Sequence, residues 1–264
     1  LIDHLMTVGD LFLMCLIIWL SVKHGKILPI ILSVVQTAVV LYTEFTAEVA
    51  EAPHMMVDWL TILMCVIIAF IGGFICIYTV GYMKGYHKHH TEVKDRQPFF
   101  FSMLFLFLAA MFGLVLSQNL IWIYFFWEIT SVISFLMIGY TRTEEAVNNS
   151  FCALWMNLLG GLGFAVAIAI MAQISGSLQL IHVVEVGAPL PLMCLALAGI
   201  TKSAQLPFST WLLGAMVAPT PSSALLHSAT MVKAGVYLLI RISPALEGNM
   251  VGLIVSSIGG FTFI

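Results

Sequence analysis

The stretch AGITKSAQLPFSTW, Ala198–Trp211, contains a lysine and, five residues later, a proline within an otherwise apolar run. A charged side chain at the centre of a membrane helix costs at least about 2.5 kcal/mol on insertion scales. Pro207 has no N–H to donate to the carbonyl of Ser203, and its ring clashes with that carbonyl. We therefore predict that the helix is broken within residues 203–208 and that Lys202 ends its first half.

The composition indicates a membrane protein. Of the 264 residues, 61% are hydrophobic and 9% are charged, whereas soluble domains have about 25% charged residues. A helix that crosses the bilayer needs about 20 apolar residues. Eight such stretches precede the start of a ninth at 250–264, and they lie at 5–22, 27–43, 59–80, 98–117, 119–138, 148–172, 189–217 and 222–241. The sequence therefore predicts an all-α, polytopic transmembrane helix bundle whose partner is the lipid bilayer and not a nucleic acid.

The loop charges predict the orientation. The loops after the second, fourth and sixth spans contain no Lys or Arg, while those after the first, third and fifth contain Lys23, Lys26, Lys84, Lys88, Lys94, Arg96 and Arg142. By the positive-inside rule the N-terminus is outside, in what we expect to be a prokaryotic cytoplasmic membrane. Leu1 begins the chain and the ninth apolar run stops early, so we expect a piece of a longer protein.

Few ionisable side chains fall well inside a span. Arg241 closes the eighth span and is interpreted as an interfacial anchor, and every Asp and Glu other than Glu128, including Asp10, is assigned to a loop or a segment end. This leaves one buried acid, Glu128, and two buried bases, Lys202 and Lys233. They could form a structural ion pair that only sets helix register. They could also act as a proton switch, because a nearby carboxylate changes the proton affinity of a buried lysine.

The eighth span contains further polar residues that fit the proton-switch hypothesis. His227 and Lys233 are six residues apart, about 9 Å along a helix, and Thr230 lies midway. A membrane histidine is more often a packing hydrogen-bond donor, but here it shares a span with a second ionisable group. Together with Glu128 and Lys202, these residues form a polar line across three predicted helices, a pattern typical of proton relays.

Three stretches resemble a known family. TKSAQLPFSTWLLGAMVAPTPSSALLHSATMVKAGVYLL (201–239) is similar to the signature of the antiporter-like membrane subunits shared by respiratory complex I, Mrp-type sodium/proton antiporters and energy-converting membrane-bound hydrogenases. FFWEITSVISFLMIGY (125–140) resembles the fifth-helix motif of that family, and YTVGYMKG (78–85) resembles the end of its third helix.

The resemblance implies a fold and roles for the polar residues. It implies an antiporter-like fold with a broken seventh helix, of which this chain holds the first of two inverted repeats. Residues 1–97 are then helices one to three, 98–241 the repeat of helices four to eight, and 242–264 the start of the ninth helix. Glu128 takes the place of the fifth-helix glutamate, Lys202 that of the broken-helix lysine, and His227 and Lys233 those of the eighth-helix relay.

Two functions are compatible with the resemblance. ATMVKAG, with lysine at 233, resembles Mrp-type and energy-converting hydrogenase subunits more than the complex I subunit. LLGAMVAPTPSSALLHS resembles an Ech-type hydrogenase, which favours a proton-translocating subunit of a redox-driven pump with other membrane subunits and peripheral redox subunits as partners. The alternative is the large subunit of an Mrp-type antiporter. The five cysteines include no CxxC pair, so we expect no metal, cofactor, catalytic centre or redox centre in this chain.

Overall fold

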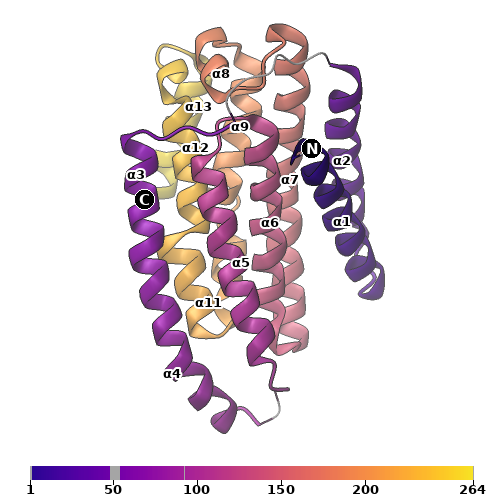
Figure 1. The fold of residues 1–264 in the computed structure, drawn as a ribbon, viewed down its shortest axis with the longest axis vertical. Coiled ribbons are helices and arrows are strands. Elements are labelled where there is room, and N and C mark those ends of the chain that lie inside the picture. The colour runs from indigo at the N-terminus through magenta and orange to yellow at the C-terminus, as the bar shows by residue number, and fades with distance from the viewer. Residues whose placement is uncertain (1, 48–53, 92, 264) are drawn as a thin grey trace.

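The computed structural model describes residues 2–47, 54–91 and 93–263, and helices make up almost all of this part of the chain (Figure 1). Its only β-type pairings there are two isolated bridges, Met55–Ser117 and Asn119–Gln179. The first helices are α1 (Ile2–Lys23), α2 (Ile27–Thr46), and α3 (Trp59–Ile67), which continues through the π-helical turn η1 (Ile68–Gly72) into α4 (Gly73–His89). There follow α5 (Gln97–Leu116), α6 (Leu120–Ile138), η2 (Gly139–Thr141), α7 (Glu144–Ser175), α8 (Leu180–Val186), α9 (Pro189–Lys202), α10 (Thr210–Gly214), η3 (Ala215–Val217), α11 (Thr220–Ala224), η4 (Leu225–Ala229), α12 (Met231–Leu246) and α13 (Met250–Phe263).

Seven helical segments of the described chain are long and apolar enough to cross a membrane. They correspond to the predicted spans one to six and eight, which confirms the all-α transmembrane bundle. The seventh predicted span is divided, because α9 ends at Lys202 and α10 begins at Thr210. The short helix α8, in the loop before α9, was not predicted. The division into an N-terminal part and an inverted repeat stays a prediction.

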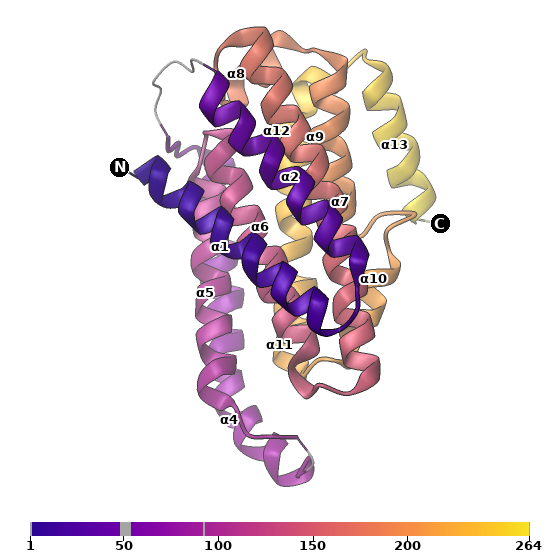
Figure 2. The ribbon, with the colours of Figure 1, turned by 90° about the vertical axis from the view of Figure 1, so that its right-hand side faces the viewer.

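The bundle is organised around α6 and α7. In Figure 1, α1 and α2 lie on one side of the bundle and α3 and α4 on the other, and Figure 2 shows α1 and α2 crossing the face of the bundle obliquely. Helix α7 packs against α2, α6 and α9. At Gly160 a Cβ would lie 2.0 Å from Oγ1 of Thr201, so α7 and α9 approach closely only because this position has no side chain.

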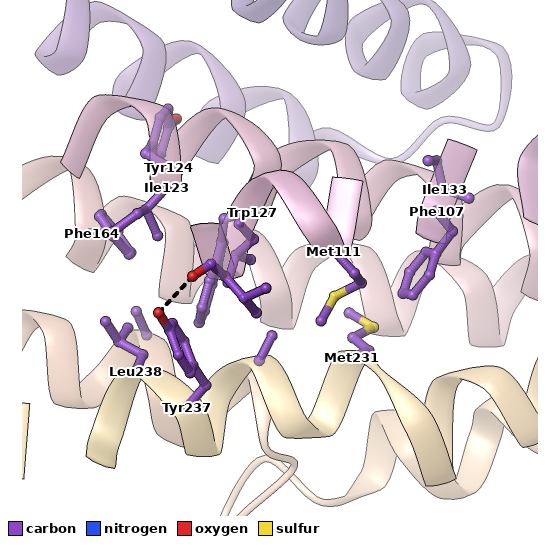
Figure 3. Close-up of a cluster of buried hydrophobic side chains, with 14 of the residues drawn as sticks. Phe107, Met111, Ile123, Tyr124, Trp127, Ile133, Phe164, Met231, Tyr237 and Leu238 are labelled. Carbon is purple, nitrogen blue, oxygen red and sulfur yellow. Dashed lines mark hydrogen bonds between the residues drawn. The ribbon is translucent and has the colours of Figure 1, made fainter. Parts of the chain in front are cut away.

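The largest buried cluster of the described residues extends through most of the bundle, and Figure 3 shows the part of it formed by α5, α6, α7 and α12. In lipid the helices associate through close packing and hydrogen bonds, because the hydrocarbon around them is as apolar as their side chains. The hydroxyl of Tyr237 donates to the carbonyl of Val115 at 2.9 Å, which connects α12 to the end of α5. The labelled members of the cluster are Phe107, Met111, Ile123, Tyr124, Trp127, Ile133, Phe164, Met231, Tyr237 and Leu238.

A charged pair connects α12 to the beginning of α3. Arg241 on α12 forms a two-pronged ion pair with Asp58, the residue that caps α3, and one of its two contacts measures 2.9 Å. Arg241 also donates to Thr61 at 2.7 Å. The interpretation of Arg241 as a simple interfacial anchor is therefore incomplete. The hydrogen bond from Arg241 is the main cause that holds the pKa of Asp58 well below its usual range.

We expect Asp58→Asn to lower the thermal stability of the intact protein. Asparagine still caps a helix but removes the charge beside Arg241. We expect the free energy of unfolding to fall by about 1.5 kcal/mol, the lower end of the range for hydrogen bonds to charged groups. The lower end applies because the side chain of Asp58 is 39% exposed and its charge is screened by solvent. The measurement is the apparent Tm in detergent at neutral pH, with the exposed Glu247→Gln as control.

The same pair predicts a pH dependence. A carboxylate whose pKa is lowered in the folded state contributes stability above its unfolded pKa, about 3.9 for aspartate, and loses it as the pH falls further toward the folded value. The difference in Tm between wild type and Asp58→Asn should therefore shrink in acid. A difference that stays constant below that pH would show that the charge of Asp58 does not stabilise the fold.

Candidate functional site

The helix break after α9 places a helix end inside the bundle. Seven residues, 203–209, separate α9 from α10. The carbonyls at the end of α9 are not left without donors: the indole N–H of Trp211 donates to the carbonyl of Thr201 at 2.9 Å, and the amide of Gln205 donates to that of Ile200 at 3.1 Å. The partial negative charge of this helix end favours a cation, and Lys202 is the residue that stands there.

Lys202 is completely buried, and α6 supplies its hydrogen-bond acceptors. Its Nζ donates to Oγ of Ser131 at 2.7 Å and to the carbonyl of Trp127 at 3.0 Å. It also lies over the indole ring of Trp127, 4.8 Å from the ring centroid, where a cation is attracted to the π face. All of these partners are neutral groups.

Glu128 lies on α6 one helical turn before Ser131 and is 3% exposed. One carboxylate oxygen accepts from Nε2 of Gln36 on α2 at 2.9 Å. The other oxygen has no donor among the described residues. It borders the space beside Gly161 on α7, where a Cβ would lie 2.4 Å from Oε1 of Glu128 and 2.8 Å from Oε1 of Gln36. Gly161 therefore leaves room for this carboxylate.

Glu128 and Lys202 lie near each other without a direct ion pair. Within the described residues, no carboxylate oxygen of Glu128 comes within 4.0 Å of Nζ of Lys202. Ser131 lies on the same helix as Glu128: its hydroxyl donates to the carbonyl of Trp127 at 3.0 Å while it accepts from Lys202. These hydrogen bonds connect Lys202 to α6 one helical turn after Glu128 and include no direct contact with the Glu128 carboxylate among the described residues.

A second buried acid was missed by the sequence prediction. Asp10 was assigned to a segment end, but α1 begins at Ile2, so Asp10 lies within the helix and is 6% exposed. Gly9 allows the close approach of α1 to α6, because a Cβ there would lie 2.5 Å from the ring of Phe125. Asp10 is close enough to Glu128 and Glu44 for their charges to interact. Gln36 was also missed, although an amide inside an apolar span is a signal that the sequence contains.

The eighth span is interrupted at Thr230. The π-helical turn η4 ends at Ala229, and Thr230, which is buried, donates to the carbonyl of Leu225 at 2.7 Å before α12 begins. The hydroxyl of Ser134, one turn beyond Ser131 on α6, lies 2.9 Å from Sδ of Met231, the neighbour of Thr230. The polar face of α6 thus extends from Glu128 toward this second break.

His227 and Lys233 were also predicted to belong to the polar line of Glu128, Lys202 and Thr230, but in the described chain no hydrogen bond or ion pair joins them to these residues. His227 is half-buried, and its Nε2 has no hydrogen-bond partner there. The place of Lys233 in the relay stays a prediction, but Lys233 is exposed in the described part of the chain, which does not bury this base. The reason is helical phase: α12 buries the face formed by Met231, Ala234, Gly235 and Leu238, and Lys233 points the opposite way.

These features define a class: a polytopic, all-α membrane protein with a broken helix that ends on a buried lysine. A family model described as "NADH:quinone oxidoreductase/Mrp antiporter, TM" matches residues 117–264. A second, described as the N-terminus of chain 5 of complex I, matches residues 52–91. The chain belongs to this family of antiporter-like membrane subunits, as the resemblance predicted.

Individual relatives agree with the family. The chain is 37% identical to a probable K⁺/H⁺ antiporter subunit of Rhizobium meliloti over 224 residues, which are 79% of this chain and 22% of the relative. It is 38% identical to a putative antiporter subunit of Staphylococcus aureus over 217 residues, 78% of this chain and 26% of the relative. It superposes on the Mrp complex of Dietzia sp. with a TM-score of 0.66 and 27% identity, covering 97% of this chain and 29% of that one. The chain thus spans about a quarter of these relatives.

We expect Gly161→Ala to destabilise the intact protein. The new methyl group would meet the carboxylate of Glu128 and the amide of Gln36, and overpacking of this kind costs about 1–3 kcal/mol. Gly73→Ala is the matched control, because a Cβ at Gly73 meets nothing within 4 Å and alanine is favoured over glycine in a helix. The apparent Tm should fall in the first variant and stay or rise in the second. Equal shifts would show that no space beside Glu128 is being protected.

Proposed function

We propose that the chain is part of the large subunit of a multisubunit cation/proton antiporter and that protons pass through Glu128 and Lys202. The observation that carries the proposal is the ammonium group of Lys202, fully buried at a helix break and held by neutral oxygens alone. A buried charge without a counter-charge is costly. A lysine in such a place is suited to gain and lose its proton during a cycle.

The polar face of α6 supplies a route between the two groups. Ser131 contacts Lys202 directly and lies one turn from Glu128. A proton can move along such a row when a hydroxyl or a water bridges each gap, and polar groups inside spans are the usual sites of proton relays. Glu128 has one carboxylate oxygen free of donors in the described chain, which leaves it able to accept a proton.

Asp10 and Gln36 extend this site toward α1 and α2. Gln36 holds one oxygen of Glu128 at 2.9 Å, and Thr7 on α1 donates to Glu44 on α2 at 2.6 Å. These groups lead from the middle of α6 toward the beginning of α1 and the end of α2. We propose that they set the position of the Glu128 carboxylate. His227, Thr230 and Lys233 remain proposed members of the continuing path.

The names of the relatives favour an antiporter over the redox-driven pump. The two relatives named above are antiporter subunits by name, and the solved structure compared above is an Mrp complex. The description of the family model also includes NADH:quinone oxidoreductase, which keeps the pump as the second candidate. The subunit composition of the purified complex separates the two: iron–sulfur or hydrogenase subunits would support the pump, and small membrane subunits alone would support the antiporter.

We expect Lys202→Met to abolish proton-coupled transport while the complex still assembles. Methionine has a similar length and no proton to exchange, so the packing is kept and the proton site is lost. Transport is measured as cation-driven proton movement in vesicles reconstituted with the intact complex. Lys88→Met, an exposed lysine near the end of α4, is the matched control and should transport normally. Normal transport by Lys202→Met would rule out a path through this lysine.

We expect Glu128→Gln to slow transport at least about tenfold, which corresponds to about 1.4 kcal/mol in the barrier. Glutamine keeps the shape and removes the proton-binding charge. Combined with Lys202→Met it should cost little more than either change alone, because residues that act as one unit are not additive. Rates of the two single variants and the double variant are compared in identical vesicles. Losses that multiply would mean that the two residues do separate jobs.

A further inference from the structure

An apolar groove with a basic end lies between α1, α5 and α6. Its volume is about 790 Å³, within the usual range for sites that hold a small molecule. Its walls include apolar side chains from all three helices, among them Phe12, Leu16, Phe99, Leu106, Phe125 and Leu136. Four basic residues also line it, Lys23, His24, Arg96 and Arg142, and none of its lining residues is acidic.

The basic residues lie at one end of the groove. Lys23 ends α1, Arg96 precedes α5, and Arg142 lies between α6 and α7. From Lys23 to Gly9, which also lines the groove, α1 extends about 21 Å at 1.5 Å per residue. One leaflet of a bilayer has a hydrocarbon depth of about 15 Å, half of the usual core. The groove therefore runs from a membrane surface through the depth of one leaflet.

The basic residues of the groove have no carboxylate in direct contact within the described part of the chain. No described carboxylate forms an ion pair with Lys23, Arg96 or Arg142. Asp95 accepts from the amide of Gln97 at 3.0 Å and lies 3.4 Å from His87 instead.

Arg96 is the clearest example of a basic residue of the groove without a carboxylate partner in the described chain. Its Nε is buried and has no hydrogen-bond partner in the described chain. Burial lowers the pKa of Arg96, and the nearby charge of Arg142 lowers it further. One terminal nitrogen of Arg96 donates to the carbonyl of Tyr140. Arg96 and Arg142 both line the groove, and two guanidinium groups without a carboxylate partner among the described residues suit an anion with several oxygens, because such groups recognise phosphate.

We infer that this groove binds one anionic phospholipid, with its phosphate held by Lys23, Arg96 and Arg142 and an acyl chain lying between α1, α5 and α6. The inference goes beyond the proposed transport function and does not depend on it. The positive charge of the basic residues favours an anionic head group. The length and the apolar walls of the groove favour an acyl chain. Basic pockets between membrane helices bind anionic head groups by the same physical principle.

The test is lipid binding to the intact complex, purified, delipidated and titrated with phosphatidylglycerol, with bound lipid counted by native mass spectrometry. The double variant Lys23→Gln/Arg142→Gln should weaken one binding event about thirtyfold, from the loss of two basic side chains at a membrane surface. Lys84→Gln/Lys88→Gln removes the same charge outside the groove and should bind like wild type. Phosphatidylcholine and short-chain phosphatidylglycerol should both bind more weakly at this site.

A second variant tests the apolar part without changing charge. Leu136 lines the groove and is half-buried, so Leu136→Trp should fill it and remove the same binding event. Unchanged phosphatidylglycerol binding in both groove variants would overturn the inference. So would an equal loss in the Lys84→Gln/Lys88→Gln control, or a groove that holds a helix of another subunit in the intact complex.

Discussion

The ammonium group of Lys202, fully buried at the end of a broken helix, is the constraint on which the rest of this structure depends. A membrane interior provides no water to hydrate it, so neighbouring helices must supply oxygen atoms. Helix α6 does so with the hydroxyl of Ser131 and the carbonyl of Trp127. The break that places Lys202 there also frees backbone carbonyls, and Trp211 donates its indole N–H to one of them.

The packing around α6 follows from the same requirement. Helix α7 must come close to both α6 and α9 to exclude lipid from the buried charges. Gly160 and Gly161 allow this, the first beside Thr201 and the second beside Glu128. On the far side, Gly9 brings α1 onto Phe125 and thereby places Asp10 beside the same polar region. Small residues at contacts are the usual means by which membrane helices approach closely.

Among the side chains that the structure describes, the buried acidic and basic groups are two carboxyls, Asp10 and Glu128, and one ammonium, Lys202. None of them has an opposite charge in direct contact, in contrast to Asp58 and Arg241, whose oxygen and nitrogen atoms are matched. The two arrangements suit different roles. A matched pair stabilises one structure, while buried charges without a direct partner of opposite charge leave each group able to change its protonation.

Much of the candidate site could be predicted from sequence because its signals are local. A proline interrupts a helix through its own ring and missing N–H, so the break beside Lys202 could be placed within a few residues. Glu128 stood out because it lies far from either end of its span. Asp10 was misplaced because the start of α1 could not be located, and Arg241 was interpreted alone because its partner, Asp58, lies 183 residues away in sequence.

The sequence by itself thus determined the approximate limits of seven membrane spans and the position of the break, since span length and proline chemistry depend only on neighbouring residues. Only the tertiary structure decided which polar groups meet. It turned Lys233 to the exposed face of α12, placed Ser131 in contact with Lys202, and brought Gln36 to Glu128. The physical reason is that a helix has many faces, and which one is buried depends on the helices that pack against it.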